Sequence, residues 1–134
     1  MDQLRHVRQS RGTDCGVACV RILAGVSAAC AMKAPKLEPA AIFHRTRPEQ
    51  IRAALASFGV WMFREVHCED WSKIPQRVNR ALLVVNYDDV KDTWHWVVFD
   101  RADPKTPILD PQSKNRRSVH RSTRLFSYYR VESA

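Results

Sequence analysis

The chain has 134 residues, of which 45% are hydrophobic and 27% charged, and its 22 basic and 14 acidic residues give a net charge of +8. This length fits one domain, which we expect to span residues 1–134, and the composition is unlike that of a disordered or fibrous chain. No apolar run approaches the length of a membrane span, and the first residues contain no hydrophobic stretch typical of a secretion signal. We therefore expect a cytoplasmic protein without a membrane span, and export by a signal-independent route stays open.

Helices are predicted in the first half of the chain. We expect residues 15–25 to form a helix, with Asp14 as its N-cap and Gly25 at its end. Residues 33–39 contain two prolines and predict a connector. Residues 48–58 have apolar side chains at helical spacing and predict an amphipathic helix.

Strands are predicted mainly in the second half. The segments with strand character are 60–66, 81–87, 94–100 and 106–110. We also expect a short helix within 71–80 and a last short helix within 122–129. Helices followed by strands indicate an α+β domain, not a βαβ repeat.

The four cysteines are Cys15, Cys19, Cys30 and Cys68. In a chain without a secretion signal, they are better interpreted as reduced thiols than as two disulfides. No Cys-x-x-Cys or paired-histidine spacing completes a four-ligand zinc set. We therefore predict neither a metal site nor a cofactor.

Cys15 lies where a reactive thiol is favoured. A helix begins there, and the free N–H groups and partial positive charge of a helix N-terminus favour a thiolate. Gly16 follows without a Cβ, so we expect a substrate carbonyl to approach closely there. Gln9 could donate a hydrogen bond to an oxyanion. The alternative is that Cys15 is a small buried residue of an ordinary helix.

His95 and Asp110 are predicted to meet across a hairpin. Strand alternation puts His95 on one face with Val97 and Phe99, and Asp110 on one face with Ile108. If Phe99 pairs with Thr106, His95 lies directly opposite Asp110, with Cβ atoms about 5 Å apart. The carboxylate would hold the imidazole in one tautomer and leave its other nitrogen for a thiol. A slip of one residue would separate the two side chains.

Other aromatic and polar side chains lie near the predicted pair. Trp94 and Trp96 alternate with His95 and are expected in the core or back wall. Asn86 ends the neighbouring strand, where it contacts substrate or, alternatively, caps a turn.

The sequence resembles the papain-like cysteine peptidase domain of bacterial bacteriocin exporters, which removes double-glycine leader peptides. The resemblance covers most of the chain and rests on the following residues: Gln9, Asp14-Cys15-Gly16-Val17-Ala18-Cys19, Phe58-Gly59, His95-Trp96-Val97-Val98 and Asp110-Pro111. No exporter membrane domain or ATPase follows, so we expect a free-standing relative. The resemblance implies a minimal papain-like fold, with an N-terminal helical half packed on a C-terminal antiparallel sheet.

The same resemblance implies roles for individual residues. Cys15 would be the nucleophile, His95 the general base and acid, Asp110 the orienting carboxylate and Gln9 the oxyanion donor, together with the backbone N–H of Cys15. The expected substrate is a peptide or protein, cleaved at a peptide, isopeptide or other amide bond. The oligomeric state is not readable from the sequence.

Two alternatives remain at this stage. One is a catalytically inactive papain-like domain that binds peptides. The other, less favoured, is a nucleic-acid-binding module, because basic residues concentrate near the chain ends but no nucleic-acid-binding signature is present. These basic residues are Arg5, Arg8, Arg11, Lys114, Arg116, Arg117, Arg121, Arg124 and Arg130.

Overall fold

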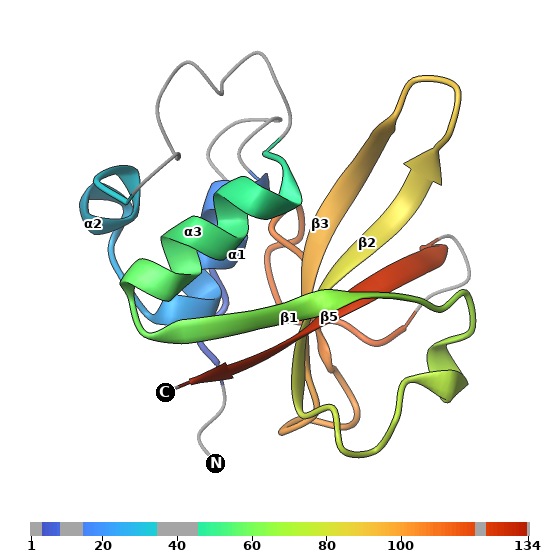
Figure 1. Cartoon of the computed structure of the whole chain (residues 1–134). Helices are drawn as coiled ribbons and strands as arrows, with labels where there is room; N and C mark the ends of the chain where they lie inside the picture. Colours follow the sequence, from blue (N-terminus) through green and yellow to red (C-terminus); the bar gives the residue numbers. More distant parts are fainter. Residues whose placement is uncertain (1–3, 9–14, 35–45, 120–122, 134) are drawn as a thin grey trace.

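The computed structural model of the chain describes residues 4–8, 15–34, 46–119 and 123–133. Three helices lie on one side of a twisted five-stranded sheet (Figure 1). No helix in these ranges is both long enough and apolar enough to cross a membrane.

The first helix, α1 (Cys15–Ala24), begins at the predicted residue. Gly25 follows it with φ +68°, a left-handed conformation that glycine adopts without strain. The short helix α2 (Ala28–Met32) comes next, and the Ser27 hydroxyl caps it by accepting a hydrogen bond from the Cys30 N–H at 3.2 Å.

The helix α3 (Pro48–Ser57) matches the predicted amphipathic helix. Pro48 occupies the first helical position, where a missing N–H costs nothing. The side chain of Gln50 accepts a hydrogen bond from the Arg47 N–H at 2.6 Å, which gives the backbone N–H of the N-cap residue a partner. The buried face consists of Ile51, Ala54 and Leu55.

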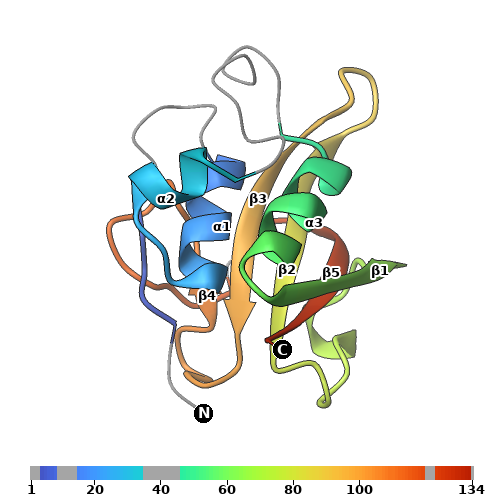
Figure 2. The ribbon, with the colours of Figure 1, turned by 60° about the vertical axis from the view of Figure 1, so that its left-hand side comes forward.

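The sheet is antiparallel throughout, in the order β1-β5-β2-β3-β4. Its strands are β1 (Val60–His67), β2 (Arg80–Asp88), β3 (Thr93–Asp100), β4 (Ile108–Leu109) and β5 (Leu125–Ser133). In Figure 2, α1 lies beside β3, and α3 lies over the part of the sheet nearer β1. The predicted α+β class is confirmed.

Both faces of the sheet are covered by apolar side chains. Strand β2 shows this clearly, because residues 81–85 are all buried: Leu82 and Val84 face the helices, while Leu83 and Val85 face the opposite core. The second core is closed by Ile74 and Val78 from the segment before β2, among others. The continuous apolar run therefore forms a strand buried on both faces, as predicted.

One local prediction is wrong, and another is confirmed only in part. Residues 123–129 do not form the last helix expected within 122–129; the chain instead enters β5, which pairs with both β1 and β2. The tyrosines and Val131 of β5 prefer strand conformation. The edges of β1 and β2 also supply backbone hydrogen-bond partners, which favour a strand over a helix here. Within 71–80, only Trp71–Lys73 is helical, as one 3₁₀ turn.

Candidate active site

His95 and Asp110 meet where β3 continues past the end of the short strand β4. His95 Nε2 lies 2.6 Å from Asp110 Oδ1, and the two side chains are 12% and 7% exposed. The backbone N–H of Gln112 donates to the same Oδ1 at 2.9 Å. A buried carboxylate held this way fixes the orientation and tautomer of the imidazole.

The hairpin register differs from the predicted one by two residues. Phe99 pairs with Ile108, whereas we expected it to pair with Thr106. The expectation that His95 lies directly opposite Asp110 is therefore wrong. Because side chains alternate with a period of two, the shift leaves both on the same face as diagonal neighbours, still within reach of one another.

Cys15 completes this group from the helical half. It is the first residue of α1, and it is 2% exposed. Its thiol forms a side-chain hydrogen bond with the imidazole of His95. Since Nε2 of His95 faces Asp110, Nδ1 is the ring nitrogen left for the sulfur. Side chains from α1, β3 and the residue after β4 thus form a continuous thiol, imidazole and carboxylate series.

The electrostatics of this series favour an imidazolium. Burial by itself would lower the pKa of His95, but hydrogen bonds with Asp110 and Cys15 and the negative charge of both partners outweigh it, so this pKa rises from 6.5 to about 9. Burial would likewise raise the pKa of Asp110, but hydrogen bonds from His95 and Arg117 hold it well below its usual range. An imidazolium in contact with Cys15 is the kind of neighbour that favours a thiolate over a thiol.

The remaining cysteines lie in different surroundings. None of the four cysteines forms a disulfide; Cys19 is buried, Cys30 exposed and Cys68 half-buried. Burial, followed by the negative charges of Cys15 and Asp110, raises the pKa of Cys19 well above its usual value. Cys19 is therefore held as a neutral thiol one helical turn after Cys15.

The missing side chain of Gly16 leaves space for another residue of the protein, Thr46. A Cβ built on Gly16 would lie 2.6 Å from the Cβ of Thr46 and 2.7 Å from its hydroxyl oxygen. Thr46 is buried, and its carbonyl accepts a hydrogen bond from the Trp96 indole N–H at 2.8 Å. Thr46 occupies the space that the missing side chain leaves, while the expected close approach of a substrate carbonyl at Gly16 stays a prediction. Trp96 itself is a core residue, as predicted.

The side chain of Asn86 is used to join β2 to the start of β5. Asn86 has φ +54°, and its side-chain oxygen accepts a hydrogen bond from the Arg124 N–H at 2.8 Å. The Asn86 N–H in turn donates to the Arg124 carbonyl at 2.8 Å. This contact fits the capping alternative, while the predicted substrate contact of Asn86 stays a prediction.

Gln9 and Asp14 lie outside the described residues. The oxyanion-donor role of Gln9 and the N-cap role of Asp14 therefore stay predictions.

Arg117 is a site residue that the sequence interpretation missed. Its Nη2 lies 2.7 Å from Asp110 Oδ2 and also donates to the Thr123 hydroxyl at 3.1 Å. In the sequence, Arg117 is one of several basic residues in a polar loop, and nothing local distinguishes it from Arg116. The side chain of Arg116 turns elsewhere, to Asp100 at 3.3 Å. Both arginines thus form internal ion pairs, which removes them from the basic surface considered for nucleic acid.

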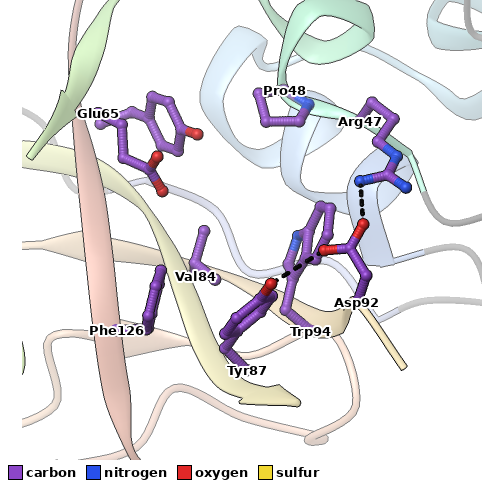
Figure 3. Close-up of a pocket in the computed structure, with 9 residues that line it drawn as sticks. Arg47, Pro48, Glu65, Val84, Tyr87, Asp92, Trp94 and Phe126 are labelled. Carbon is purple, nitrogen blue, oxygen red and sulfur yellow. Dashed lines mark hydrogen bonds and ion pairs between the residues drawn. The ribbon is translucent and has the colours of Figure 1, made fainter. Parts of the chain in front are cut away.

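A pocket of about 200 Å³ lies between the start of α3 and the sheet. In Figure 3, Arg47, Asp92 and Tyr87 form a hydrogen-bonded chain on one side, and Glu65 lies across from them. Glu65 accepts hydrogen bonds from two buried hydroxyls, those of Ser127 and Tyr129. Trp94, Phe126, Val84 and Pro48 contribute further lining.

This pocket combines an aromatic wall with fixed polar groups. Burial, together with the charge and hydrogen bond of Glu65, raises the pKa of Tyr129, so its hydroxyl remains a donor. Apolar walls with a few oriented polar groups are typical of sites that bind side chains or small ligands. Arg47 directly follows Thr46, so the pocket is connected along the chain to the contact at Gly16.

A metal centre is not apparent in this arrangement. Within residues 4–8, 15–34, 46–119 and 123–133, no group of three or more His, Cys, Asp or Glu side chains is placed to hold a metal ion.

Comparison with known proteins gives a structural likeness. No family model and no curated protein matches the sequence. Among solved structures, the chain is similar to a double-glycine motif protease from an AMS/PCAT transporter, solved in complex with the leader peptide. The TM-score is 0.68 at 12% sequence identity, and the alignment covers 98% of this chain and 92% of that one. At this identity, the likeness shows the fold: the chain has the α+β, papain-like fold of that protease.

Proposed function

We propose that the protein is a cysteine peptidase or related amide hydrolase. One observation carries the proposal: the half-buried imidazole of His95 hydrogen-bonds the Asp110 carboxylate through one nitrogen and the Cys15 thiol on its other side. This is the arrangement that nucleophilic catalysis by a thiol needs, with the base in contact with the nucleophile and oriented by a third group. The papain-like fold supports the same assignment.

The first half of the reaction forms a thioester. His95 already holds the proton of the Cys15 thiol in the ion-paired state, and the thiolate attacks the carbonyl carbon of the scissile amide. The resulting oxyanion is held by the backbone N–H of Cys15 and, as we propose from the family resemblance, by the side-chain amide of Gln9. His95 then gives its proton to the amine nitrogen as the C–N bond breaks, which leaves the acyl group on sulfur.

The second half releases the acyl group by hydrolysis. Neutral His95 takes a proton from a water molecule, whose oxygen attacks the thioester carbonyl. The C–S bond then breaks, the carboxylic acid leaves and gives its remaining proton to solvent, and Cys15 and His95 return to their ion-paired state. Asp110 keeps the imidazole aligned through these proton transfers and stabilises its cationic form.

A peptide is the proposed substrate class. The structurally similar protease was solved with a leader peptide bound. In this chain, the pocket between α3 and the sheet offers Trp94 and Phe126 as apolar surface and Glu65 as a fixed acceptor. We propose that side chains of the substrate contact this pocket while the amide to be cleaved lies at Cys15.

Thiol alkylation tests the proposal. Iodoacetamide should modify Cys15 at neutral pH faster than it modifies Cys30, although Cys30 is exposed and Cys15 is buried, because only a thiolate reacts readily. A His95→Gln variant should lose this difference. Cys30→Ala is the matched control, since it should remove a slow reaction and leave the fast one. Equal rates at the four cysteines would contradict the proposal.

The inactive peptide-binding alternative is separated from an enzyme by a Cys15→Ala variant. For an enzyme, this variant loses turnover and keeps peptide affinity, whereas for a binding domain the natural protein itself shows no turnover.

A further inference from the structure

We propose that Arg117 is a positioning residue for this site. It holds Asp110 ionised and directed at His95, and it thereby sets the lower pH limit at which Cys15 becomes a nucleophile. The inference rests on the proposed function of Cys15 and His95 and adds a device that regulates the same site.

Arg117 is placed behind Asp110 by the backbone. It pairs with Ile108 in an isolated bridge, with N–H to carbonyl distances of 2.9 and 3.0 Å in the two directions. Asp110 lies two residues after Ile108, so the bridge fixes the guanidinium and the carboxylate relative to each other. The Thr123 hydroxyl, in a residue only 6% exposed, supplies a second acceptor for the guanidinium at 3.1 Å.

The two oxygens of Asp110 are divided between opposite sides. Oδ1 accepts from Gln112 N–H and faces His95, and Oδ2 lies 2.7 Å from Arg117 Nη2. A charge-assisted bond of this length on Oδ2 prevents the carboxylate from turning away from the imidazole. The side chain of Arg117 is 27% exposed, so solvent screens it only in part.

The groups that titrate together are Cys15 and Cys19 from α1, His95 from β3, and Asp110 after β4, with Arg117 as the fixed cation. A fixed positive charge favours the deprotonated form of every group near it. Arg117 therefore favours both the carboxylate of Asp110 and the thiolate of Cys15 as the pH falls. Removing this charge should shift the acid limb of Cys15 reactivity to higher pH.

The test is the rate of Cys15 alkylation by iodoacetamide between acid and neutral pH, measured by mass spectrometry. In Arg117→Gln, we expect the acid limb to move to higher pH by about one unit, the lower end of the effect of a neighbouring opposite charge. Lys114→Gln is the matched control, because it removes the same charge from an exposed position in the same loop. It should leave the limb within a few tenths of a unit of the natural protein.

Arg117→Lys covers the case in which the uncharged variant does not fold. It keeps the cation, so the limb should stay in place, but a single ammonium does not reproduce the planar fork that reaches both Asp110 Oδ2 and the Thr123 hydroxyl. We expect its maximum rate to fall at least about threefold, and an unchanged rate would overturn the proposal.

Two further outcomes also decide the matter. A folded Arg117→Gln protein with an unshifted acid limb, whether or not its maximum rate falls, would reduce Arg117 to a structural residue and overturn the inference. If Cys15 of the natural protein reacts no faster than Cys30, the proposed function fails, and the role of Arg117 fails with it. If Cys15 reacts fast and its rate depends on His95 but not on Arg117, the role of Arg117 is refuted while the proposed function stands.

Discussion

Replacing Asp110 by Asn should lower the pKa of His95. The substitution keeps the size of the side chain and removes its charge. In the natural protein this pKa rises from 6.5 to about 9, which corresponds to about 3 kcal/mol in favour of the imidazolium at ~1.4 kcal/mol per unit. Asp110 and Cys15 both contribute to this rise in the pKa of His95. If Asp110 accounts for half of the rise, its contribution exceeds one pKa unit. The variant also leaves the Arg117 guanidinium without its carboxylate, and that cation disfavours a proton on His95 further.

Nuclear magnetic resonance titration of the imidazole signals measures this change directly. We expect the pKa of His95 to fall by more than one unit in Asp110→Asn, and the alkylation rate of Cys15 at neutral pH to fall about tenfold or more with it. Asp103→Asn is the matched control, because it removes a carboxylate from the turn between β3 and β4 that bonds to Thr106 instead of His95. A His95 pKa that is unchanged in Asp110→Asn, or equally changed in Asp103→Asn, would refute the reasoning.

Further predictions concern stability and binding. In a Cys15→Ala background, Asp110 remains as the partner of His95, and we expect it to keep the pKa of His95 above the unfolded value of 6.5. The folded state then binds more protons than the unfolded state, so the free energy of unfolding by urea should fall as pH rises above about 6.5, and a flat or rising profile would contradict this. Gly16→Ala should destabilise the protein by about 1–3 kcal/mol through overlap with Thr46, with partial recovery on adding Thr46→Gly; unchanged thermal unfolding would show that the contact is loose. Binding to generic duplex DNA should weaken steeply as salt rises, as non-specific charge attraction does, and tight binding that persists in salt would instead support a nucleic-acid function.

Local sequence pattern was enough to predict several elements. The start of α1 follows from the change of composition at Cys15 and the stop at Gly25. The apolar run of β2 indicated a strand buried on both faces. The shared face of His95 and Asp110 depends only on strand parity, so it survived an error of two residues in register.

Other features depend on contacts between distant segments. Strand β5 forms because β1 and β2 each present an open edge, which its own residues do not reveal. The contact of Gly16 with Thr46 joins two residues that lie thirty positions apart, and the bond of Arg117 to Asp110 depends on a backbone bridge to Ile108. Such pairings are set by the packing of the whole domain, so a single sequence carries no local signal for them.

The central claim is that Cys15 is ionised at neutral pH because His95 holds the proton. The ultraviolet absorbance of the thiolate, followed against pH and corrected by subtracting the Cys15→Ala variant, measures this without a substrate. The account predicts one thiolate already present at neutral pH, lost in His95→Gln. A Cys15 signal that rises only near the ordinary cysteine pKa of about 8.5, with or without His95, would contradict it.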